Sequence, residues 1–372
     1  MTLSDICELI VDCPHSTAKD EGAGYPLIRT PNIGRGRLIL DDVHRVSKDI
    51  YDKRNARAIP QDDDLILARE APAGNVAIIK NGEQVCLGQR TVLIRPDKRK
   101  VYPDFLVYYI LAPQQQYELL GTANGATVAH VNIPVIKALP VELPAIEVQQ
   151  KAADILKAYD DLIENNQKQI KLLEEAAQRL HKEWFVDLQF PGHENTEIVD
   201  GLPEGWSNAK VTDLLEIKYG KDHKALEEGD IPVYGSGGIM RKVQPILYSG
   251  ESVLIPRKGS LNNILFVEGD FWTIDTMFYS IPRLENVAKY AYLYLRGLDM
   301  YSFNIGAAVP SMTTKILSGM DIVLPSKQIL QQFEEQLSPA FARMKCLEMQ
   351  YETAAEARDR LLPKLMSGEI EL

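Results

Sequence analysis

The chain has 372 residues, of which 45% are hydrophobic, 25% charged and 8% aromatic, which excludes a disordered or fibrous polypeptide and predicts two or three globular domains. Its formal net charge of −11 excludes an overall basic protein, but residues 1–140 carry 17 basic and 17 acidic side chains, so the partner stays open. No apolar run reaches the roughly 20 residues of a membrane span, and the start lacks signal-peptide features, so we expect a cytoplasmic protein without a membrane partner.

The cysteines are scattered and form no Cys-x-x-Cys pair, which predicts free thiols in a reducing compartment. Cys7, Cys13 and His15 are residue types that bind metals. No second cluster completes a set of four ligands, so we predict no metal site and no cofactor.

Residues 1–144 have the pattern of a mixed, strand-rich globular domain. Pro103 followed by Asp104 predicts the start of a helix over residues 103–111. We expect its aromatic side chains, Phe105, Tyr108 and Tyr109, in the core rather than on a base-stacking surface. Short apolar runs bounded by Gly, Pro and Asn predict strands at residues 64–69, 76–79 and 91–95.

Residues 145–190 contain the first long helix. Glu147–Phe185 has no Gly and no Pro and follows one heptad throughout. Such a narrow apolar seam requires a partner helix. Asn166 is polar at a seam position, where it is expected to fix the register, with a contact to a partner subunit as the alternative. The seam residues are Leu156, Tyr159, Ile163, Asn166, Ile170, Leu173 and Leu180.

Residues 191–325 comprise a polar linker and a second strand-rich domain, with a strand predicted at 252–256 and a helix at 288–295. Residues 326–372 carry a second, weaker heptad, which supplies the partner helix. Its seam residues are Leu330, Phe333, Leu337, Met344 and Leu347.

An internal repeat joins these parts. The fold class that follows is α+β: two mixed strand-rich globular domains joined by two long antiparallel coiled-coil helices, with pseudo-two-fold symmetry. On DNA, two domains at a fixed separation suit two half-sites roughly 34–36 Å apart. At an offset of 181, Gly125–Val128 and Val141–Pro144 match Gly306–Val309 and Ile322–Pro325. At an offset of 188, Leu67–Arg69 and Asn75 match Ile255–Arg257 and Asn263. At an offset of 208, Leu3–Leu9 matches Val211–Ile217.

Several motifs together resemble the specificity subunit of type I restriction–modification systems, over nearly the whole chain. The resemblance implies a non-catalytic reader of a bipartite double-stranded DNA sequence, with two target-recognition domains. It also implies two modification subunits as partners and, for cleavage, restriction (motor-nuclease) subunits. The motifs are Asp12–Thr17, Ile28–Ile33, Ala68–Pro72, Cys86–Arg90, Tyr159–Asn166, Leu172–Glu175, Glu183–Phe185, Leu202–Trp206 and Leu361–Ile370.

Motifs for catalysis are missing from the sequence. An adenine methyltransferase needs an Asn/Asp-Pro-Pro-aromatic loop, and the chain contains no Pro-Pro dipeptide. Gly34–Gly36 and Gly235–Gly238 lack the spacing of nucleotide-binding loops. Asp62–Asp64 is expected to be a solvated turn, because three consecutive carboxylates point to different sides of a strand. We therefore predict no catalytic residue.

Recognition of DNA requires Arg or Lys for guanine edges and phosphates, and Asn or Gln for adenine edges. The repeat favours Arg69 and Arg257 most, because each follows the same apolar strand. The candidates in the first domain are His15, Ser16, Arg29, Thr30, Asn32, Arg69, Gln89 and Arg90, and those in the second are Lys221, Arg257, Lys258, Asn262 and Asn263.

The sequence thus predicts a DNA-recognition subunit that directs adenine methylation and cleavage by partner subunits. The alternatives are a coiled-coil adaptor with two protein-binding domains and, less favoured, a stand-alone DNA methyltransferase. The acidic outer faces of the first long helix, with Glu164, Glu174 and Glu175, are expected to be solvated, and the resemblance implies that part of the helices docks the modification subunits.

Overall fold

The computed structural model describes residues 1–121, 130–306 and 308–372. The chain forms two compact units: Met1–Asn165 with Gln350–Leu372 is the first unit, and Asn166–Met349 is the second unit. Each is a mixed α/β structure with its own hydrophobic core. The part of the repeat at Gly125–Val128, and Ala307 in its counterpart, lie outside the described residues.

The main sheet of the first unit has the strand order β1-β8-β5-β6-β3, and its pairs are antiparallel except for β3 with β6. The predicted strands at 64–69, 76–79 and 91–95 are confirmed. The strands are β1 (Cys7–Asp12), β8 (Thr91–Pro96), β5 (Leu65–Ala68), β6 (Val76–Ile78) and β3 (Gly36–Arg37). A smaller sheet contains β4 (Arg45–Val46), β2 (Tyr25–Ile28) and β7 (Cys86–Leu87).

The predicted helix over residues 103–111 is α2 (Pro103–Leu111). Phe105, Tyr108 and Tyr109 are all buried, as expected of core residues. Their burial follows from the position of α2 against β6, between the sheet and the long helices. The other helices of this unit are η1 (Leu3–Ile6), η2 (Thr30–Asn32), α1 (Lys48–Arg54), α3 (Pro113–Leu120) and α4 (Ile133–Ala138).

The main sheet of the second unit has the order β12-β17-β15-β16-β13-β14. Its strands are β12 (Leu215–Tyr219), β17 (Met277–Pro282), β15 (Tyr248–Pro256), β16 (Leu265–Thr273), β13 (Glu228–Gly235) and β14 (Gly238–Val243). The remaining elements are η3 (His193–Asn195), β9 (Ile198–Val199), β10 (Leu202–Pro203), β11 (Ser207–Lys210), α6 (Val211–Leu214), α7 (Ala288–Arg296), η4 (Met300–Phe303), α8 (Thr314–Gly319) and β18 (Asp321–Leu324).

The two main sheets are copies of one another. β1, β8, β5, β6 and β3 correspond, in order and in the sense of every pairing, to β12, β17, β15, β16 and β13. The parallel pair recurs as well, since β13 pairs with β16 as β3 pairs with β6. The repeat read from the sequence is therefore a repeat of structure, to which the second unit adds β14.

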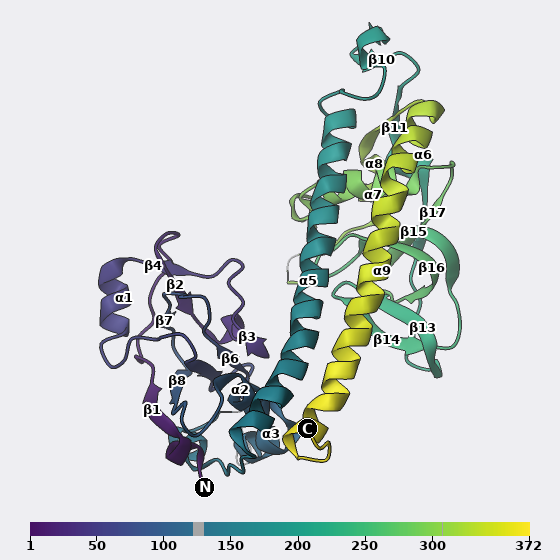
Figure 1. Cartoon of the computed structure of the whole chain (residues 1–372). Coiled ribbons are helices and arrows are strands. Elements are labelled where there is room, and N and C mark those ends of the chain that lie inside the picture. The colour runs from purple at the N-terminus through teal and green to yellow at the C-terminus, as the bar shows by residue number, and fades with distance from the viewer. Residues whose placement is uncertain (122–129, 307) are drawn as a thin grey trace. The chain divides into compact units, whose positions relative to one another are not determined.

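Two long helices, α5 (Ile146–Phe185) and α9 (Lys327–Met366), each have 40 residues, and both their starts and their ends lie 181 residues apart. In the second unit, the Trp184 ring lies 5.4 Å from Phe333, and Arg343 Nη2 donates to Gln169 Oε1 at 3.3 Å. The helices run antiparallel there, as Figure 1 shows.

In the first unit, a buried carboxylate joins the long helices to α2. Tyr108 Oη donates to Asp160 Oδ2 at 2.7 Å, and Arg358 Nη1 donates to Asp160 Oδ1 at 2.7 Å. Asp160 is 6% exposed. Burial, together with the adjacent Asp160 charge, raises the pKa of the Tyr108 hydroxyl above its ordinary value, so it remains a donor.

The second unit uses a buried cation on α7. Lys289 donates to Glu251 of β15 at 2.8 Å and also to Glu334 of α9. Burial alone would lower the pKa of Lys289, but the hydrogen bonds to the two carboxylates outweigh it and raise the pKa. The sheet, α7 and α9 are thereby held together.

Two carboxylates of the acidic helix face, Glu164 and Glu174, are ion-paired while their side chains stay 37% and 36% exposed. Glu164 pairs with Arg37 of β3 in the first unit, and Glu174 lies 3.0 Å from Arg296 of α7 in the second. Both carboxylates therefore hold a globular part of their own unit against α5. In the described part of the chain, no helix is long and apolar enough to span a membrane.

Candidate nucleic-acid interface

Two arginines stand at the ends of equivalent strands. Arg69 follows β5 and Arg257 follows β15. The backbone N–H of Arg69 donates to the carbonyl oxygen of Arg90 at 2.8 Å, and that of Arg257 to the carbonyl oxygen of Thr276 at 2.8 Å. Arg90 and Thr276 immediately precede β8 and β17, so the two arginines occupy the same place in the two sheets.

The segments beyond these strand ends are equivalent too. The N–H of Val131 donates to the carbonyl oxygen of Arg69 at 2.9 Å, and the N–H of Met312 donates to that of Arg257 at 2.9 Å. Val131 and Met312 are 181 residues apart, which is the offset of this part of the repeat. The predicted match of Arg69 with Arg257 is confirmed for the backbone.

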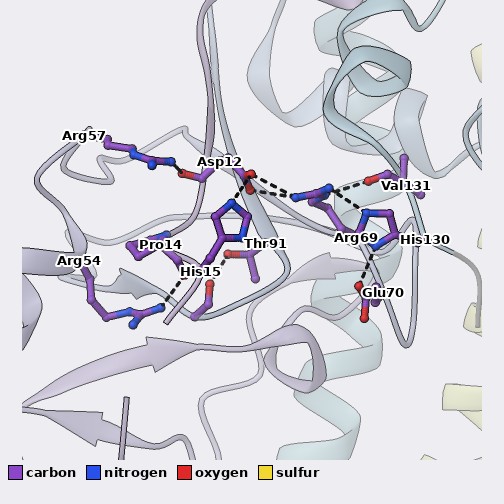
Figure 2. A network of polar contacts seen from close by, with 11 residues as sticks. Asp12, Pro14, His15, Arg54, Arg57, Arg69, Glu70, Thr91, His130 and Val131 are labelled. Carbon is purple, nitrogen blue, oxygen red and sulfur yellow. Dashed lines mark hydrogen bonds and ion pairs between the residues drawn. The ribbon is translucent and has the colours of Figure 1, made fainter. Parts of the chain in front are cut away.

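In the first unit, the Arg69 guanidinium is surrounded by partners from its own unit. Nη1 lies 3.0 and 3.2 Å from the two carboxylate oxygens of Asp12, and Nε donates to the Val131 carbonyl oxygen at 2.9 Å. Nη2 is 2.8 Å from His130 Nε2. Figure 2 shows Arg69 between Asp12 on one side and His130 and Val131 on the other. With its side chain 10% exposed, Arg69 is held by groups of its own unit, and its contact with a base stays a prediction.

The rim of this network is more accessible. Glu70 accepts from Arg90 Nε at 2.9 Å and lies 2.7 Å from His130 Nδ1. His15 Nε2 lies 3.1 Å from the Asp12 carboxylate. The side chains of His15 and Arg90 are 70% and 61% exposed, so these two predicted residues can reach an external partner.

The loop that carries His15 is anchored through its backbone. Gln89 Nε2 donates to the His15 carbonyl oxygen at 2.8 Å, and Arg54 Nη1 donates to that of Ser16 at 2.9 Å. Burial lowers the pKa of the Arg54 guanidinium from its ordinary value. Ser16 is exposed, whereas the Gln89 amide is engaged in holding the loop.

Arg29, Thr30 and Asn32 lie at η2, next to β2. Asn32 is 5% exposed; its Oδ1 accepts from the Arg29 N–H at 3.1 Å, and its Nδ2 donates to the Ile39 carbonyl oxygen at 3.1 Å. Both the oxygen and the nitrogen of this amide bind the backbone within the first unit, and a contact of Asn32 with a base stays a prediction. Arg29 and Thr30 are half-buried.

In the second unit, Arg257 has a different environment from Arg69. Its guanidinium carbon lies 5.4 Å from the centre of the Tyr219 ring, and Nη1 donates to the Asp275 carbonyl oxygen at 3.0 Å. Tyr219 is 51% exposed, and Lys258, the next residue along the chain, is exposed. The same strand end therefore presents an aromatic ring and two cations.

The other predicted residues of the second unit lie on loops. Lys221 is exposed, two residues beyond β12. Asn262 Oδ1 accepts from the Met300 N–H at 2.8 Å, and Asn263 Nδ2 donates to the Ser236 carbonyl oxygen at 2.9 Å. Both amides bind neighbouring loops, and Asn262 is exposed.

Four residues of these strand-end sites were missing from the predicted set: Asp12, Glu70, His130 and Tyr219. Glu70 immediately follows Arg69, and His130 immediately precedes Val131, so the repeat could have pointed to both. Tyr219 lies 207 residues after Asp12, one residue away from the offset of 208 that the sequence gives for this region. Only the strand pairing locates it.

The predicted solvated turn at Asp62–Asp64 is partly wrong. Asp64 is 1% exposed and its carboxylate binds Arg95 at 2.7 and 2.8 Å, because Arg95 projects across the sheet from β8. Among the described residues, no group of three or more His, Cys, Asp or Glu side chains is arranged to hold a metal ion.

The predicted seam residues lie on α5 and α9, and all are at least half-buried. Asn166 is 2% exposed, and its Nδ2 has no hydrogen-bond partner among the described residues. The buried ones are Leu156, Ile163, Asn166, Leu330, Phe333, Leu337, Met344 and Leu347, and the half-buried ones are Tyr159, Ile170, Leu173 and Leu180.

Comparison with known proteins identifies relatives of this arrangement. The family model for the type I restriction modification DNA specificity domain matches residues 1–175 and 203–345. Two matches correspond to the two copies of the sheet.

Individual relatives extend over the whole chain. A type I restriction enzyme MjaIX specificity subunit of Methanocaldococcus jannaschii is 27% identical, covering 100% of this chain and 93% of the relative. The HindI specificity subunit of Haemophilus influenzae is 22% identical, covering 84% and 88%. The crystal structure of a type I restriction-modification S subunit from M. genitalium superposes with a TM-score of 0.61 at 17% identity, covering 98% and 95%, so it has the same fold.

Proposed function

Because this chain belongs to the family of type I restriction modification DNA specificity domains, we propose that it is the subunit that recognises a bipartite double-stranded DNA sequence for a type I restriction–modification complex. The observation that carries the proposal is the duplicated sheet, in which each copy ends an equivalent strand with an arginine-bearing, polar edge. Each copy reads one half of the target. Reading base edges needs side-chain donors on a rigid frame, which strand ends provide.

In this proposal residues 1–144 and 191–325 are the target-recognition domains, and residues 145–190 and 326–372 are the conserved helices. The helices form an antiparallel coiled coil with pseudo-two-fold symmetry that sets the gap between the half-sites. The seam supports this part of the proposal, because the corresponding residues of α5 and α9 are buried or half-buried.

The chain itself is non-catalytic in this proposal. Two modification subunits supply the S-adenosylmethionine-dependent adenine methylation, and restriction subunits supply cleavage. Base flipping for methylation belongs to the partner that holds the methyl donor. The cytoplasmic location expected from the sequence remains a prediction.

The test is to incubate the purified full chain with a pool of DNA duplexes that have a random central sequence, and to sequence what it retains. We expect enrichment of one sequence with two specified parts and a constant gap. Retention without any sequence preference, or no retention, contradicts the proposal and favours an adaptor with two protein-binding domains. Methyl transfer by the chain alone with S-adenosylmethionine favours a stand-alone methyltransferase.

We assign the docking of a modification subunit to a groove along α5, in the second unit. It is lined by Leu172, Glu175, Ala176, Arg179, Leu180 and Glu183. Leu172 is 63% exposed there, and a large apolar side chain on an otherwise charged helix face suits a protein partner.

Leu172→Glu should reduce co-purification with the type I modification subunits at least tenfold, whereas the exposed control Gln167→Glu, five residues earlier on the same helix, should not. Equal co-purification of both variants excludes this groove. The retained DNA sequence should be the same for both variants, since neither residue lies at a strand end.

A further inference from the structure

The strand pairing reveals a substitution between the two copies that the sequence alignment hides. In the first unit, Asp12 pairs with Val92, the second residue of β8. In the second unit, Tyr219 pairs with Phe278, the second residue of β17. Because β1 and β8 correspond to β12 and β17, Asp12 and Tyr219 are equivalent residues.

This substitution changes what the equivalent arginine can do. The Asp12 carboxylate takes the Nη1 group of Arg69 and neutralises its charge. The Arg257 guanidinium carbon instead lies over the Tyr219 ring, 5.4 Å from its centre. A cation–π contact uses none of the N–H donors of a guanidinium.

The Tyr219 ring is itself held in place. It packs edge-on against Phe278, with 5.1 Å between the ring centres, and its hydroxyl lies 3.4 Å from Thr314 Oγ1 at the start of α8. The Asp275 carbonyl oxygen fixes one Nη1 hydrogen of Arg257 at 3.0 Å. Arg257 is thus preorganised with one edge anchored.

The charges around the two arginines also differ in sign. Glu70 follows Arg69 and binds both His130 and Arg90. Its equivalent after Arg257 is Lys258, an exposed cation. The acidic and basic side chains at the first strand end neutralise one another. The second strand end keeps a positive charge, which favours an approaching polyanion.

We propose that Arg257, held over the Tyr219 ring, reads a guanine in the half-site of the second unit, with Tyr219 as its positioning residue and Lys258 as a phosphate contact. This inference rests on the proposed function. A planar, oriented guanidinium matches the O6 and N7 acceptors of guanine in the major groove, which is the commonest specific contact between an arginine and a base. We assign no such contact to Arg69, because its Nε, Nη1 and Nη2 atoms each have a partner within the first unit.

The experiment uses the full chain and DNA duplexes with a random central sequence, and it measures the base preference at each position of the retained sequence. Arg257→Lys keeps the charge but loses the planar fork, so the preference for guanine should fall about 5- to 150-fold at one position of one half-site. Tyr219→Ala and Tyr219→Asp should lower the same preference, and Tyr219→Phe should retain it. Lys258→Gln, the matched control, should weaken binding to every sequence about equally.

Each outcome decides a separate point. If the native chain enriches no sequence, the proposed function fails together with this inference. If it enriches a two-part sequence and Arg257→Lys changes no single position, or weakens all sequences equally, only the guanine assignment is overturned. If Tyr219→Phe loses as much preference as Tyr219→Ala, the ring is not the positioning group. Unchanged preference at the other positions of the same half-site shows that the second unit is folded in each variant.

Discussion

The two units contain the same main sheet, but the residues packed between that sheet and the long helices differ in polarity. At the offset of 181 that relates α5 to α9, Asp160 corresponds to Phe341, and Arg358 corresponds to Ala177. The first unit thus places a buried ion pair where the second has apolar side chains. Phe341 lies 5.1 Å, ring to ring, from Phe266 on the neighbouring strand.

The reverse substitution occurs one turn from Ala177. His181 of α5 corresponds to Leu362 of α9. His181 is 5% exposed and stacks 5.5 Å from the Tyr290 ring, and its Nε2 has no hydrogen-bond partner among the described residues. Leu362, its counterpart in the first unit, is buried in an apolar core.

These differences teach that apolar periodicity and strand pairing maintain the repeat, whereas the polar groups within it are free to diverge. The strand ends follow the same rule, with Asp12 in one copy and Tyr219 in the other. A duplicated chain can therefore keep one frame and read two unlike half-sites. The following substitutions exchange or remove the divergent groups.

The largest effect is expected from Arg358→Ala. It leaves the Asp160 carboxylate buried without its cation, which should cost about 3–5 kcal/mol of unfolding free energy in the first unit. Urea unfolding followed by circular dichroism measures it. All three tryptophans, Trp184, Trp206 and Trp272, lie in the second unit, so their fluorescence should report a transition that changes much less.

A matched variant tests the comparison directly. The triple variant Asp160→Phe, Arg358→Ala, Tyr108→Leu replaces the polar side chains of the first unit by apolar ones, as in the second unit. It should recover at least half of the unfolding free energy that Arg358→Ala loses. Arg360→Ala, whose side chain is 78% exposed, should change stability by less than about 0.5 kcal/mol. No recovery in the triple variant would show that the two interiors are not interchangeable.

The next effect is a pH dependence that belongs to the second unit. Burial lowers the pKa of His181 from 6.5 to about 4. Above pH 6.5 His181 is neutral in the folded and in the unfolded chain. Between pH 6.5 and 4 the unfolded chain binds a proton at His181, whereas the folded chain does not. His181 therefore lowers the free energy of unfolding as the pH falls from 6.5 to 4, by about 3 kcal/mol in total.

His181→Leu introduces the residue that the first unit has at the equivalent position. Tryptophan fluorescence during urea unfolding at several pH values should show that this variant loses less stability between pH 6.5 and 4 than the native chain. Identical slopes for the two proteins would rule out His181 as the source.

A smaller effect is expected from Lys289→Met in the second unit. The change removes the cation that binds Glu251 and Glu334, whose side chains are 33% and 18% exposed. Because Glu251 can reach water and Ser338 also donates to Glu334, the loss should be about 2 kcal/mol, less than for Arg358→Ala. Lys345→Met, on a side chain that is 55% exposed, is the control and should change little. An equal loss for both lysines would contradict the assigned role of Lys289.

The elements of the fold could be predicted because each depends on residues close together in the sequence. The heptad located α5 to within one residue, and the Pro103-Asp104 pair located the start of α2. The polar interior could not be found in this way. Asp160 adjoins the predicted seam residue Tyr159, and its burial depends on Arg358, which is 198 residues away in the chain.

For the candidate interface, the sequence could predict the positions of the two arginines but not their environments. The repeat located Arg69 and Arg257, since both follow an apolar strand. It could not distinguish a bound arginine from an available one, because that depends on the residue across the sheet. The sequence alignment places Asp12 and Tyr219 one position apart. Only the strand pairing makes them equivalent, because Asp12 pairs with the second residue of β8 and Tyr219 pairs with the second residue of β17.

The smallest expected effect tests whether Arg69 is structural. Asp12→Asn removes the charge that binds the Arg69 guanidinium and should cost about 1–2 kcal/mol in the first unit, measured by circular dichroism during urea unfolding. Glu118→Gln, an exposed carboxylate of the same unit, should change less than about 0.5 kcal/mol. The base preferences in both half-sites should stay as they are in the native chain, since Arg69 donates within its own unit. A changed preference in the first half-site would mean that Arg69, like Arg257, contacts a base.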